Sequence, residues 1–373
     1  MAGFVLIRAI GLLALTWSPA RNGRPLVDVL AVWDGGWYVR IAEDGYADHL
    51  DLSAPVTDQI TGSLAFFPGY PMLIRLVSDL TGLDSQWAGV AISLVAGAVA
   101  AAGIAVLASD WAGYRVGVLA ALLWAAAPMG VVGSMVYTEA LFTALVVWTF
   151  VALRRHSWAV VGALGLAAGL ARPTGIALGT AVAAYVAWIW WGGRTSRESD
   201  AERSGVLPLV AAGLALAGTP AFWLWVAIRA DRWDGWFAVQ NAFWGSRFDG
   251  GASIASLAGG VLLGETPPGL EMMSLATVLC LLAAVGLLVL ASRARVWWPL
   301  LVYTAISLVM VIGSAGYFSS KLRFLVPMFV LAFPLARWLA GQSRLMRLVA
   351  VAAAVVATTV TGTLLLLSWP FAI

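Results

Sequence analysis

The sequence predicts an all-α polytopic membrane protein with about eleven transmembrane helices and a large first extracytoplasmic loop. Two features of the composition carry this prediction: 61% of the 373 residues are hydrophobic and only 11% are charged. The mean hydropathy of +0.90 is well above the range of soluble proteins. The third observation is a series of apolar runs, many of which reach the roughly 17–25 residues that a helix needs to cross a bilayer.

These apolar runs define the predicted spans in chain order. They cover residues 2–19, 87–109, 114–130, 134–153, 157–171, 174–191, 206–228, 272–291, 296–313, 322–340 and 346–367. The third and fifth runs are short, which favours broken or tilted helices there. Two further runs, 71–80 and 253–263, are too short to span and predict re-entrant or interfacial helices. We see no second domain, so residues 1–373 are expected to form one transmembrane unit.

The placement of arginine predicts the orientation of these spans. Ten arginines fall at alternate ends of the predicted helices: Arg115, Arg154, Arg155, Arg194, Arg197, Arg203, Arg293, Arg295, Arg344 and Arg347. The positive-inside rule assigns these ends, and with them the N-terminus, to the cytoplasm. The long loops 20–86 and 229–271 then lie outside the plasma membrane. Most of the carboxylates fall on that side, and the two loops are expected to form the active-site face.

The first of these loops concentrates polar and aromatic residues in an otherwise apolar chain. Its carboxylates are Asp28, Asp34, Glu43, Asp44, Asp48, Asp51 and Asp58, and its large aromatic residues include Trp33, Trp37, Tyr38 and Tyr46. Aromatic faces beside carboxylates are a common way to hold a sugar. The alternative is a solvated loop whose tryptophans anchor it at the membrane interface.

Several classes of chemistry are excluded or disfavoured by the sequence. Cys280 is the only cysteine, which excludes disulfides and cysteine-based metal sites. His49 and His156 are too far apart in the predicted topology to bind one metal ion. The chain has no Walker loop, no dinucleotide-binding glycine motif and no Asp-x-Asp motif. We expect no cofactor and no nucleic-acid partner, and a dependence on metal stays open. The substrate must then supply the energy of the reaction, as a lipid-linked activated sugar does.

Short motifs in the first half of the chain resemble the PIG-V mannosyltransferases. They are Trp33-Asp34, Trp37-Tyr38, Ile41-Ala42-Glu43, Gly45-Tyr46, Ala65-Phe66-Phe67-Pro68-Gly69-Tyr70-Pro71, Tyr137-Thr138-Glu139-Ala140-Leu141-Phe142 and Ala171-Arg172-Pro173-Thr174-Gly175. The sequence departs from the family at Asp44, where a histidine is expected. The resemblance implies a GT-C fold and an enzyme that transfers mannose from polyprenyl-phosphate mannose with inversion at the anomeric carbon.

The chemistry of such a transfer selects candidate catalytic residues from the outer loops. Inverting transfer needs one carboxylate as general base, and we assign this role to Asp34, with Glu43 and Asp44 in reserve. The alternative for Asp34 is that it caps a short helix. Arg172, Lys321 and Arg323 lie at outer helix ends and are expected to bind the donor phosphate. Their alternative role is snorkelling to lipid headgroups.

A second group of residues is expected to bind substrate beside this centre. It consists of Trp33, Trp37, Tyr38, Tyr46, Glu139 and Gln240. Acids inside a membrane are usually functional, although Glu139 has the alternative of a structural ion pair with a neighbouring arginine. Trp233, Trp236 and Trp244 either stack on sugar rings or anchor the second outer loop.

The predicted function is mannosyl transfer to a hydroxyl of a glycolipid, glycan or protein on the outer face of the membrane. Two alternatives remain open. One is a transporter or flippase of a lipid-linked glycan, for which internal symmetry and charges along a transmembrane path are expected. The other is a GT-C enzyme that uses arabinose, glucose or galactose instead of mannose.

Overall fold

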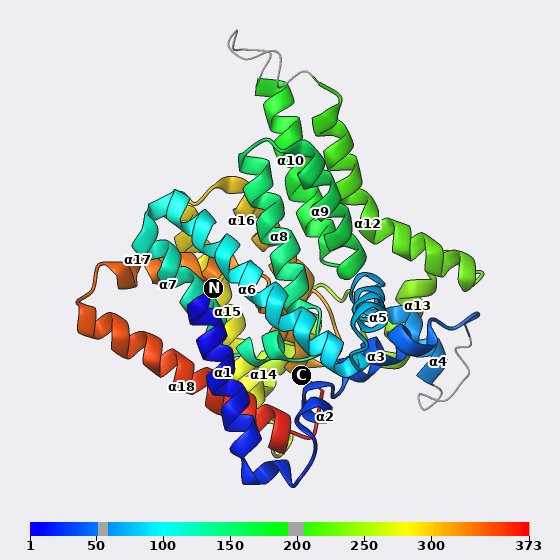
Figure 1. Cartoon of the computed structure of the whole chain (residues 1–373), viewed down its shortest axis with the longest axis horizontal. Coiled ribbons are helices and arrows are strands. Elements are labelled where there is room, and N and C mark those ends of the chain that lie inside the picture. Colours follow the sequence, from blue (N-terminus) through cyan, green and yellow to red (C-terminus); the bar gives the residue numbers. More distant parts are fainter. Residues whose placement is uncertain (51–58, 193–204, 373) are drawn as a thin grey trace.

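A computed structural model of the chain describes residues 1–50, 59–192 and 205–372 (Figure 1). Throughout these ranges the regular secondary structure is helical, and the one β-type contact is an isolated bridge between Phe248 and Ser314. This confirms the predicted all-α class. Five residues named above, Asp51, Asp58, Arg194, Arg197 and Arg203, lie outside the described ranges.

The helices follow the predicted apolar runs closely. The α-helices are α1 Ala2–Trp17, α2 Leu26–Leu30, α3 Asp34–Asp44, α4 Gln59–Gly62, α5 Gly69–Thr81, α6 Ser85–Ala112, α7 Tyr114–Ala125, α8 Glu139–Arg154, α9 Trp158–Ala171, α10 Gly175–Gly192, α12 Leu207–Arg229, α13 Gly235–Trp244, α14 Ala252–Leu263, α15 Glu271–Arg293, α16 Trp298–Ile312, α17 Ala332–Ala340 and α18 Arg344–Ser368. Short 3₁₀ turns connect them: η1 Pro19–Arg21, η2 Ser63–Ala65, η3 Gly130–Ser134, η5 Phe318–Lys321, η6 Arg323–Leu325 and η7 Phe329–Leu331.

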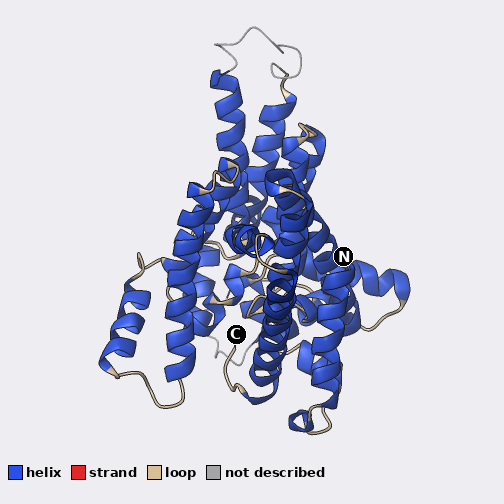
Figure 2. Ribbon diagram, turned by 90° about the vertical axis from the view of Figure 1, so that its left-hand side faces the viewer, coloured by secondary structure: helices blue, strands red, loops and turns tan. Residues whose placement is uncertain are grey.

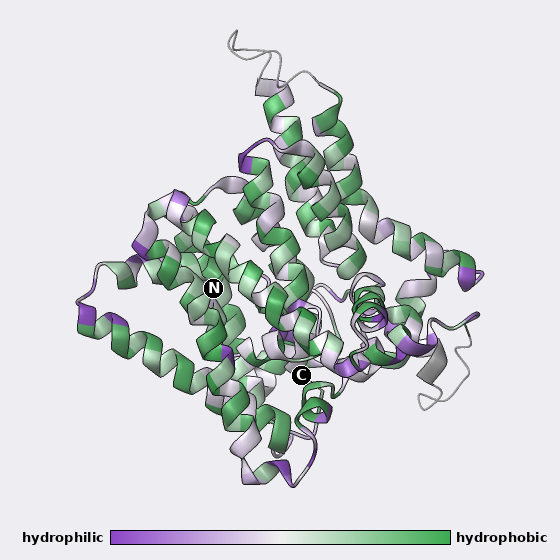
Figure 3. Cartoon of the chain, in the orientation of Figure 1, coloured by the Kyte–Doolittle hydropathy of each residue, from purple (hydrophilic) through white to green (hydrophobic). Residues whose placement is uncertain are grey.

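Five of the described helices, α6, α10, α12, α15 and α18, are long and apolar enough to cross a membrane. A bent pair, 318–325 with 329–340, makes a sixth candidate. Figure 3 shows hydrophobic residues along most helices and hydrophilic ones gathered at helix ends and connections. The chain is therefore a multi-pass membrane protein. Helices α1, α7, α9, α14 and α16 are apolar but shorter, and the total of about eleven spans stays a prediction.

Two predicted spans differ from the structure, and a proline explains each difference. The run 114–130 ends as an α-helix at Ala125, because Pro128 disfavours helical conformation in the residue before it. The run 322–340 is not one helix but a chain of 3₁₀ turns leading into α17, bent by 72°. Pro327 lies at this break, where its missing N–H and its ring prevent a continuous helix.

Glycine lets α9, α10 and α12 pack with their backbones close together, and Figure 1 shows the three helices side by side. Figure 2 shows the helices and their connecting loops from a second side. A Cβ atom on Gly169 of α9 would lie 2.8 Å from Cα of Gly218 in α12. A Cβ atom on Gly179 of α10 would lie 2.6 Å from the carbonyl oxygen of Ala215 in α12. Small residues at helix contacts are a common packing solution in membranes. This packing fixes the turn between α9 and α10, which contains Arg172.

The described parts of the first long loop, residues 20–50 and 59–86, fold back onto the same end of the bundle. Helix α5 begins at Gly69, whose Cβ position lies 3.0 Å from the carbonyl oxygen of Leu170 at the end of α9. The Phe-Phe-Pro segment before Gly69 is therefore held beside the turn that carries Arg172. Helix α3 packs against α5 and α6. A group of polar segments thus meets where α8 begins and α9 ends.

Candidate active site

One cavity of about 270 Å³ lies at this meeting point. It is bounded by the start of α3, residues 65–67, the turn 171–174, helix α13 and residues 310–324. Its polar lining residues are Asp34, Tyr38, Thr138, Arg172, Thr174, Gln240, Ser246, Ser314, Tyr317, Ser320, Lys321 and Arg323. The structure thus brings six residues of the predicted site to one cavity. They come from the two long loops, from the turn between α9 and α10 and from the C-terminal third of the chain.

Asp34 is the first residue of α3, and the local backbone fixes its position. Trp33, just before it, has φ 56° and ψ −117°, a conformation that costs a non-glycine residue about 1–3 kcal/mol. Gly35, just after it, lies against Val136, with its Cβ position 3.4 Å from the Val136 carbonyl oxygen. Trp33 occupies the helix-capping position, so Asp34 does not cap α3. It places a carboxylate in the first turn, where the helix dipole favours negative charge.

Arg323 is the ion-pair partner of Asp34, with 2.5 Å between Nη2 and Oδ2. The two residues are 289 positions apart in sequence. The Arg323 guanidinium also lies over the rings of Tyr137 and Phe324, at 4.9 and 5.0 Å from their centroids. Such cation–π contacts stabilise a guanidinium removed from water.

Arg172 forms the second ion pair of the site. Its Nη1 atom lies 2.7 Å from Oε1 of Glu139 and donates a hydrogen bond to the Thr138 hydroxyl at 2.7 Å. The Glu139 carboxylate is fully buried and also lies 3.8 Å from Nε of Arg323. Glu139 therefore makes the ion pair with a neighbouring arginine that was the alternative to its predicted role in substrate binding. It does not line the cavity itself. The site thus contains a continuous chain of ion pairs, from Asp34 to Arg323 and through Glu139 to Arg172.

Lys321 also lines the cavity, but backbone oxygens hold its ammonium group. Nζ donates to the carbonyl oxygens of Val311, at 2.8 Å, and Ser314. These carbonyls lie at the C-terminal end of α16, where a cation is favourable. Lys321 is only 2% exposed, so its ammonium group is buried among these carbonyl oxygens at the edge of the cavity.

Aromatic rings form one wall of the cavity. Phe66 stacks on Trp37 at 5.4 Å and makes edge contacts with Tyr38 at 5.2 Å and Trp244 at 5.5 Å. Gln240 donates a 3.3 Å hydrogen bond from its amide to the carbonyl oxygen of Ala65. Trp236 donates to the same oxygen at 3.1 Å, which fixes α13 against the first loop.

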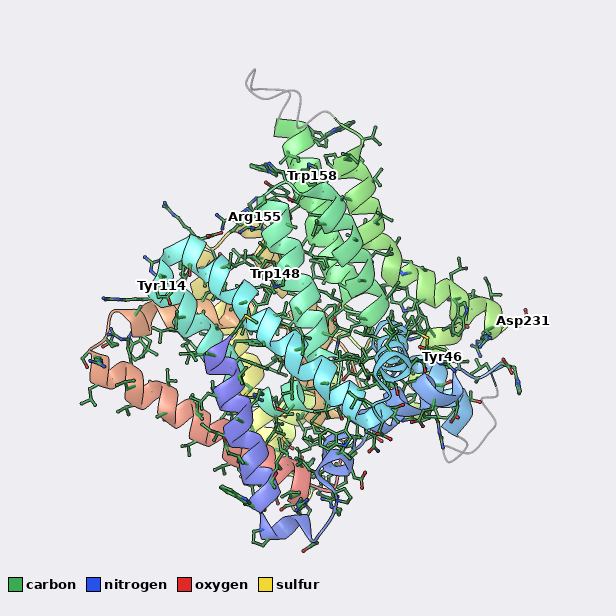
Figure 4. All side chains as sticks on the ribbon, in the orientation of Figure 1. Tyr46, Tyr114, Trp148, Arg155, Trp158 and Asp231 are labelled. Atoms are coloured by element: carbon green, nitrogen blue, oxygen red, sulfur yellow. The ribbon has the colours of Figure 1, made fainter. Side chains whose placement is uncertain are left out.

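Six of the predicted site residues lie outside the cavity lining: Trp37 and Glu139, described above, and Trp33, Glu43, Asp44 and Tyr46. Glu43 and Asp44 are exposed at the far end of α3. Trp33 is half-buried just before α3. Tyr46 donates a hydrogen bond to the carbonyl oxygen of Phe66 at 2.9 Å, so it supports the aromatic wall from behind. Figure 4 shows Tyr46 near α5, and Arg155 and Trp158 at the opposite end of the bundle. The predicted roles of these six residues stay predictions.

Sequence reasoning gave no role to Thr138, Tyr317, Ser320 and Phe324, all of which line the cavity. The Phe324 ring lies beneath both guanidinium groups, at 5.3 Å from that of Arg172. Its place directly after Arg323 was a usable signal, because arginine commonly stacks on aromatic rings. No group of three or more His, Cys, Asp or Glu side chains within the described ranges is arranged to hold a metal ion.

Comparison with solved structures assigns the fold. The chain is similar to ArnT from Cupriavidus metallidurans bound to undecaprenyl phosphate, at 14% identity and a TM-score of 0.55, covering 97% of this chain and 76% of that one. It is also similar to the oligosaccharyltransferase of Archaeoglobus fulgidus, at 11% identity and a TM-score of 0.54. That match covers 97% of this chain and 53% of the oligosaccharyltransferase, so our chain spans about half its length. The protein has the GT-C fold. No protein-family model and no curated protein sequence matches the chain.

Proposed function

We propose that the protein is an inverting glycosyltransferase that moves mannose from polyprenyl-phosphate mannose to an acceptor hydroxyl. The observation that carries this proposal is one cavity lined by the Asp34 carboxylate and the guanidinium groups of Arg172 and Arg323. A base and two phosphate-binding cations are the groups that this reaction needs. The GT-C fold and the likeness to a protein bound to undecaprenyl phosphate support a lipid-linked donor.

Asp34 acts as the general base in this proposal. The acceptor hydroxyl gives its proton to an Asp34 carboxylate oxygen while its own oxygen bonds to the anomeric carbon of the sugar. The bond from that carbon to the donor phosphate breaks, and its electron pair stays on the phosphate oxygen. One displacement inverts the anomeric carbon and leaves polyprenyl phosphate as the second product.

Arg172 and Arg323 stabilise the leaving phosphate. The donor is a phosphodiester with one negative charge, and the leaving group is a phosphomonoester that gains a second one. Guanidinium groups bind two phosphate oxygens at once, and they act strongly where water is excluded. Both arginines are largely buried, with side chains 11% and 9% exposed. Glu139 contacts both guanidinium groups from outside the cavity and positions them, and it does not bind the sugar.

The aromatic wall accounts for sugar binding in this proposal. Phe66 and Trp244 line the cavity with aromatic rings, and Gln240 is a polar residue of the same lining. The assignment of mannose rests on the motif resemblance around Trp33-Asp34 and 65–71. The acceptor is a glycolipid, glycan or protein hydroxyl. Arabinose, glucose and galactose remain the alternative sugars for assay.

We place the cavity on the extracytoplasmic face of the plasma membrane. The turn between α12 and α13, with Asp231, lies toward the cavity end of the bundle, whereas Arg155 lies at the other end (Figure 4). After replacement of Cys280 by serine, single cysteines at these two positions report orientation. A membrane-impermeant maleimide added to intact cells should label Asp231→Cys and leave Arg155→Cys unlabelled. The reverse labelling would contradict the proposed orientation.

Transfer by purified protein tests the function. Detergent-solubilised protein should transfer radiolabelled mannose from its polyprenyl phosphate to lipids extracted from a strain that lacks the gene. The transfer should need no membrane gradient, which separates an enzyme from a transporter. Parallel donors carrying glucose, galactose or arabinose identify the sugar. Absence of transfer from all four donors would reject the proposed function.

A further inference from the structure

Arg323 has two carboxylate partners that differ in their access to the cavity. Asp34 lies 2.5 Å from Nη2, lines the cavity and has a side chain that is 18% exposed. Glu139 lies 3.8 Å from Nε, is fully buried and does not line the cavity. A ligand that enters the cavity therefore meets Asp34 and not Glu139. Only the pair with Asp34 is open to exchange.

The position of Arg323 does not depend on Asp34 alone. Its guanidinium is held over the rings of Tyr137 and Phe324, at 4.9 and 5.0 Å, and its Nε lies 3.8 Å from Glu139, which does not line the cavity. The Phe324 ring also lies 5.3 Å from the Arg172 guanidinium, so both cations share this support. If the Asp34 carboxylate turned away, the guanidinium would keep three of its neighbours and present its N–H groups to the cavity.

We propose that the donor phosphate exchanges with Asp34 as the cavity-side partner of Arg323. This inference rests on the proposed function and adds a binding order to it. The phosphate oxygens take the N–H groups that now contact Oδ2 of Asp34. That exchange frees Oδ2 to accept a hydrogen bond from the acceptor hydroxyl. The base thus becomes available when the donor is in place, and the donor binds before the acceptor.

The exchange has a consequence that a base alone does not have. Because Asp34 competes with the phosphate for Arg323, removal of its charge should strengthen phosphate binding while it lowers turnover. Loss of an ion pair that is partly open to water should change the affinity for the phosphate by about three- to tenfold. A residue that only supports the fold predicts no tighter binding. A carboxylate that only repels the phosphate predicts tightening that does not depend on Arg323.

The test measures binding of undecaprenyl phosphate in detergent micelles to fluorescently labelled protein. Asp34→Asn should bind this lipid about three- to tenfold more tightly than wild type. Asp28→Asn, which removes an exposed carboxylate from the neighbouring helix α2, should leave the affinity unchanged. If Asp34→Asn unfolds at a lower midpoint than wild type, Asp34→Ser is used in its place.

A double-mutant cycle separates exchange at Arg323 from a general effect of charge. In an Arg323→Gln background, Asp34→Asn should no longer tighten binding, because the contested partner is gone. Tightening that persists in that background would overturn the proposal, and so would a wild-type affinity in Asp34→Asn. Both results leave the proposed function standing. If the wild-type protein neither binds undecaprenyl phosphate nor transfers sugar, the proposed function itself is rejected, and the exchange with it.

Discussion

Helix α8 carries a charged residue at each end, and the two ends hold their charge in different ways. At the first residue, Glu139 is fully buried, 2.7 Å from Arg172. At the last residue, Arg154 lies 3.9 Å from Asp110, and both side chains are more than a third exposed. Exposed pairs contribute little to stability, whereas buried charges within a membrane protein persist only when paired and commonly serve function.

The aromatic surroundings of the two ends differ in the same direction. Near Arg154, the rings of Trp297, Tyr185 and Trp298 pack on one another. Such clusters are typical of membrane-interface anchors. At the Glu139 end, Phe66 and Trp244 line a cavity instead. Tryptophan and arginine occur at both ends, so composition does not separate an anchor from a site. Burial and partner geometry do.

The largest expected effect on stability comes from breaking the buried pair. Glu139→Ala leaves the guanidinium of Arg172 buried without its carboxylate partner, and should lower the free energy of unfolding by about 3–5 kcal/mol. Asp110→Ala breaks the exposed pair at the other end and should change it by less than about 1 kcal/mol. Denaturant titration in detergent measures both. Equal losses would mean that the two ends do not differ as described.

The comparison also predicts that substitutions of Arg172 and Arg154, at opposite ends of the bundle, differ in their effect on turnover. Arg172→Ala removes a cation from the leaving phosphate and should lower turnover by about 10²–10³-fold. Arg172→Lys should recover only part of it, because an ammonium group cannot bind two phosphate oxygens in the same planar way. Arg154→Ala, at the other end of the same bundle, should keep turnover within twofold. Comparable losses in both variants would remove the special role of the buried end.

Much of the fold follows from the sequence because helix ends have local causes. The predicted run 296–313 corresponds to the helix Trp298–Ile312, and 157–171 to Trp158–Ala171. The prediction was wrong for 322–340, where Pro327 and the 3₁₀ turns around it break the helix. Hydropathy averages over a window and does not register one missing N–H group.

The site was predictable in its members more than in its contacts. Asp34, Arg172 and Arg323 line one cavity, although the Asp34–Arg323 contact joins residues 289 positions apart that no local pattern could pair. Helix geometry gives a reason why Glu43 lies away from it. Nine residues at about 100° each place Glu43 roughly 180° around α3 from Asp34. This angle between Asp34 and Glu43 could have been predicted from the sequence by assuming one continuous helix from Asp34 to Asp44.

A smaller effect tests how the fold positions Arg172. A Cβ atom at Gly169 would lie 2.8 Å from Cα of Gly218, a backbone contact that cannot give way easily. Gly169→Ala should therefore cost about 1–3 kcal/mol of stability and weaken donor binding through the displaced turn. Gly213→Ala is the matched control, because nothing lies within 4 Å of its Cβ position. Thermal unfolding and donor KM are the readouts, and identical values for the two variants would argue against close packing as the cause.

The most direct test of the account is mannosyl transfer by purified Asp34→Asn protein. Asparagine keeps the size of the side chain but cannot take a proton, so turnover should fall by about 10²–10⁴-fold. Asp28→Asn, with its exposed carboxylate outside the cavity, should retain wild-type turnover. The comparison is made only between proteins that share the wild-type unfolding midpoint. Turnover by Asp34→Asn within a few-fold of wild type would contradict the assignment of Asp34 as the base and, with it, this account of the cavity.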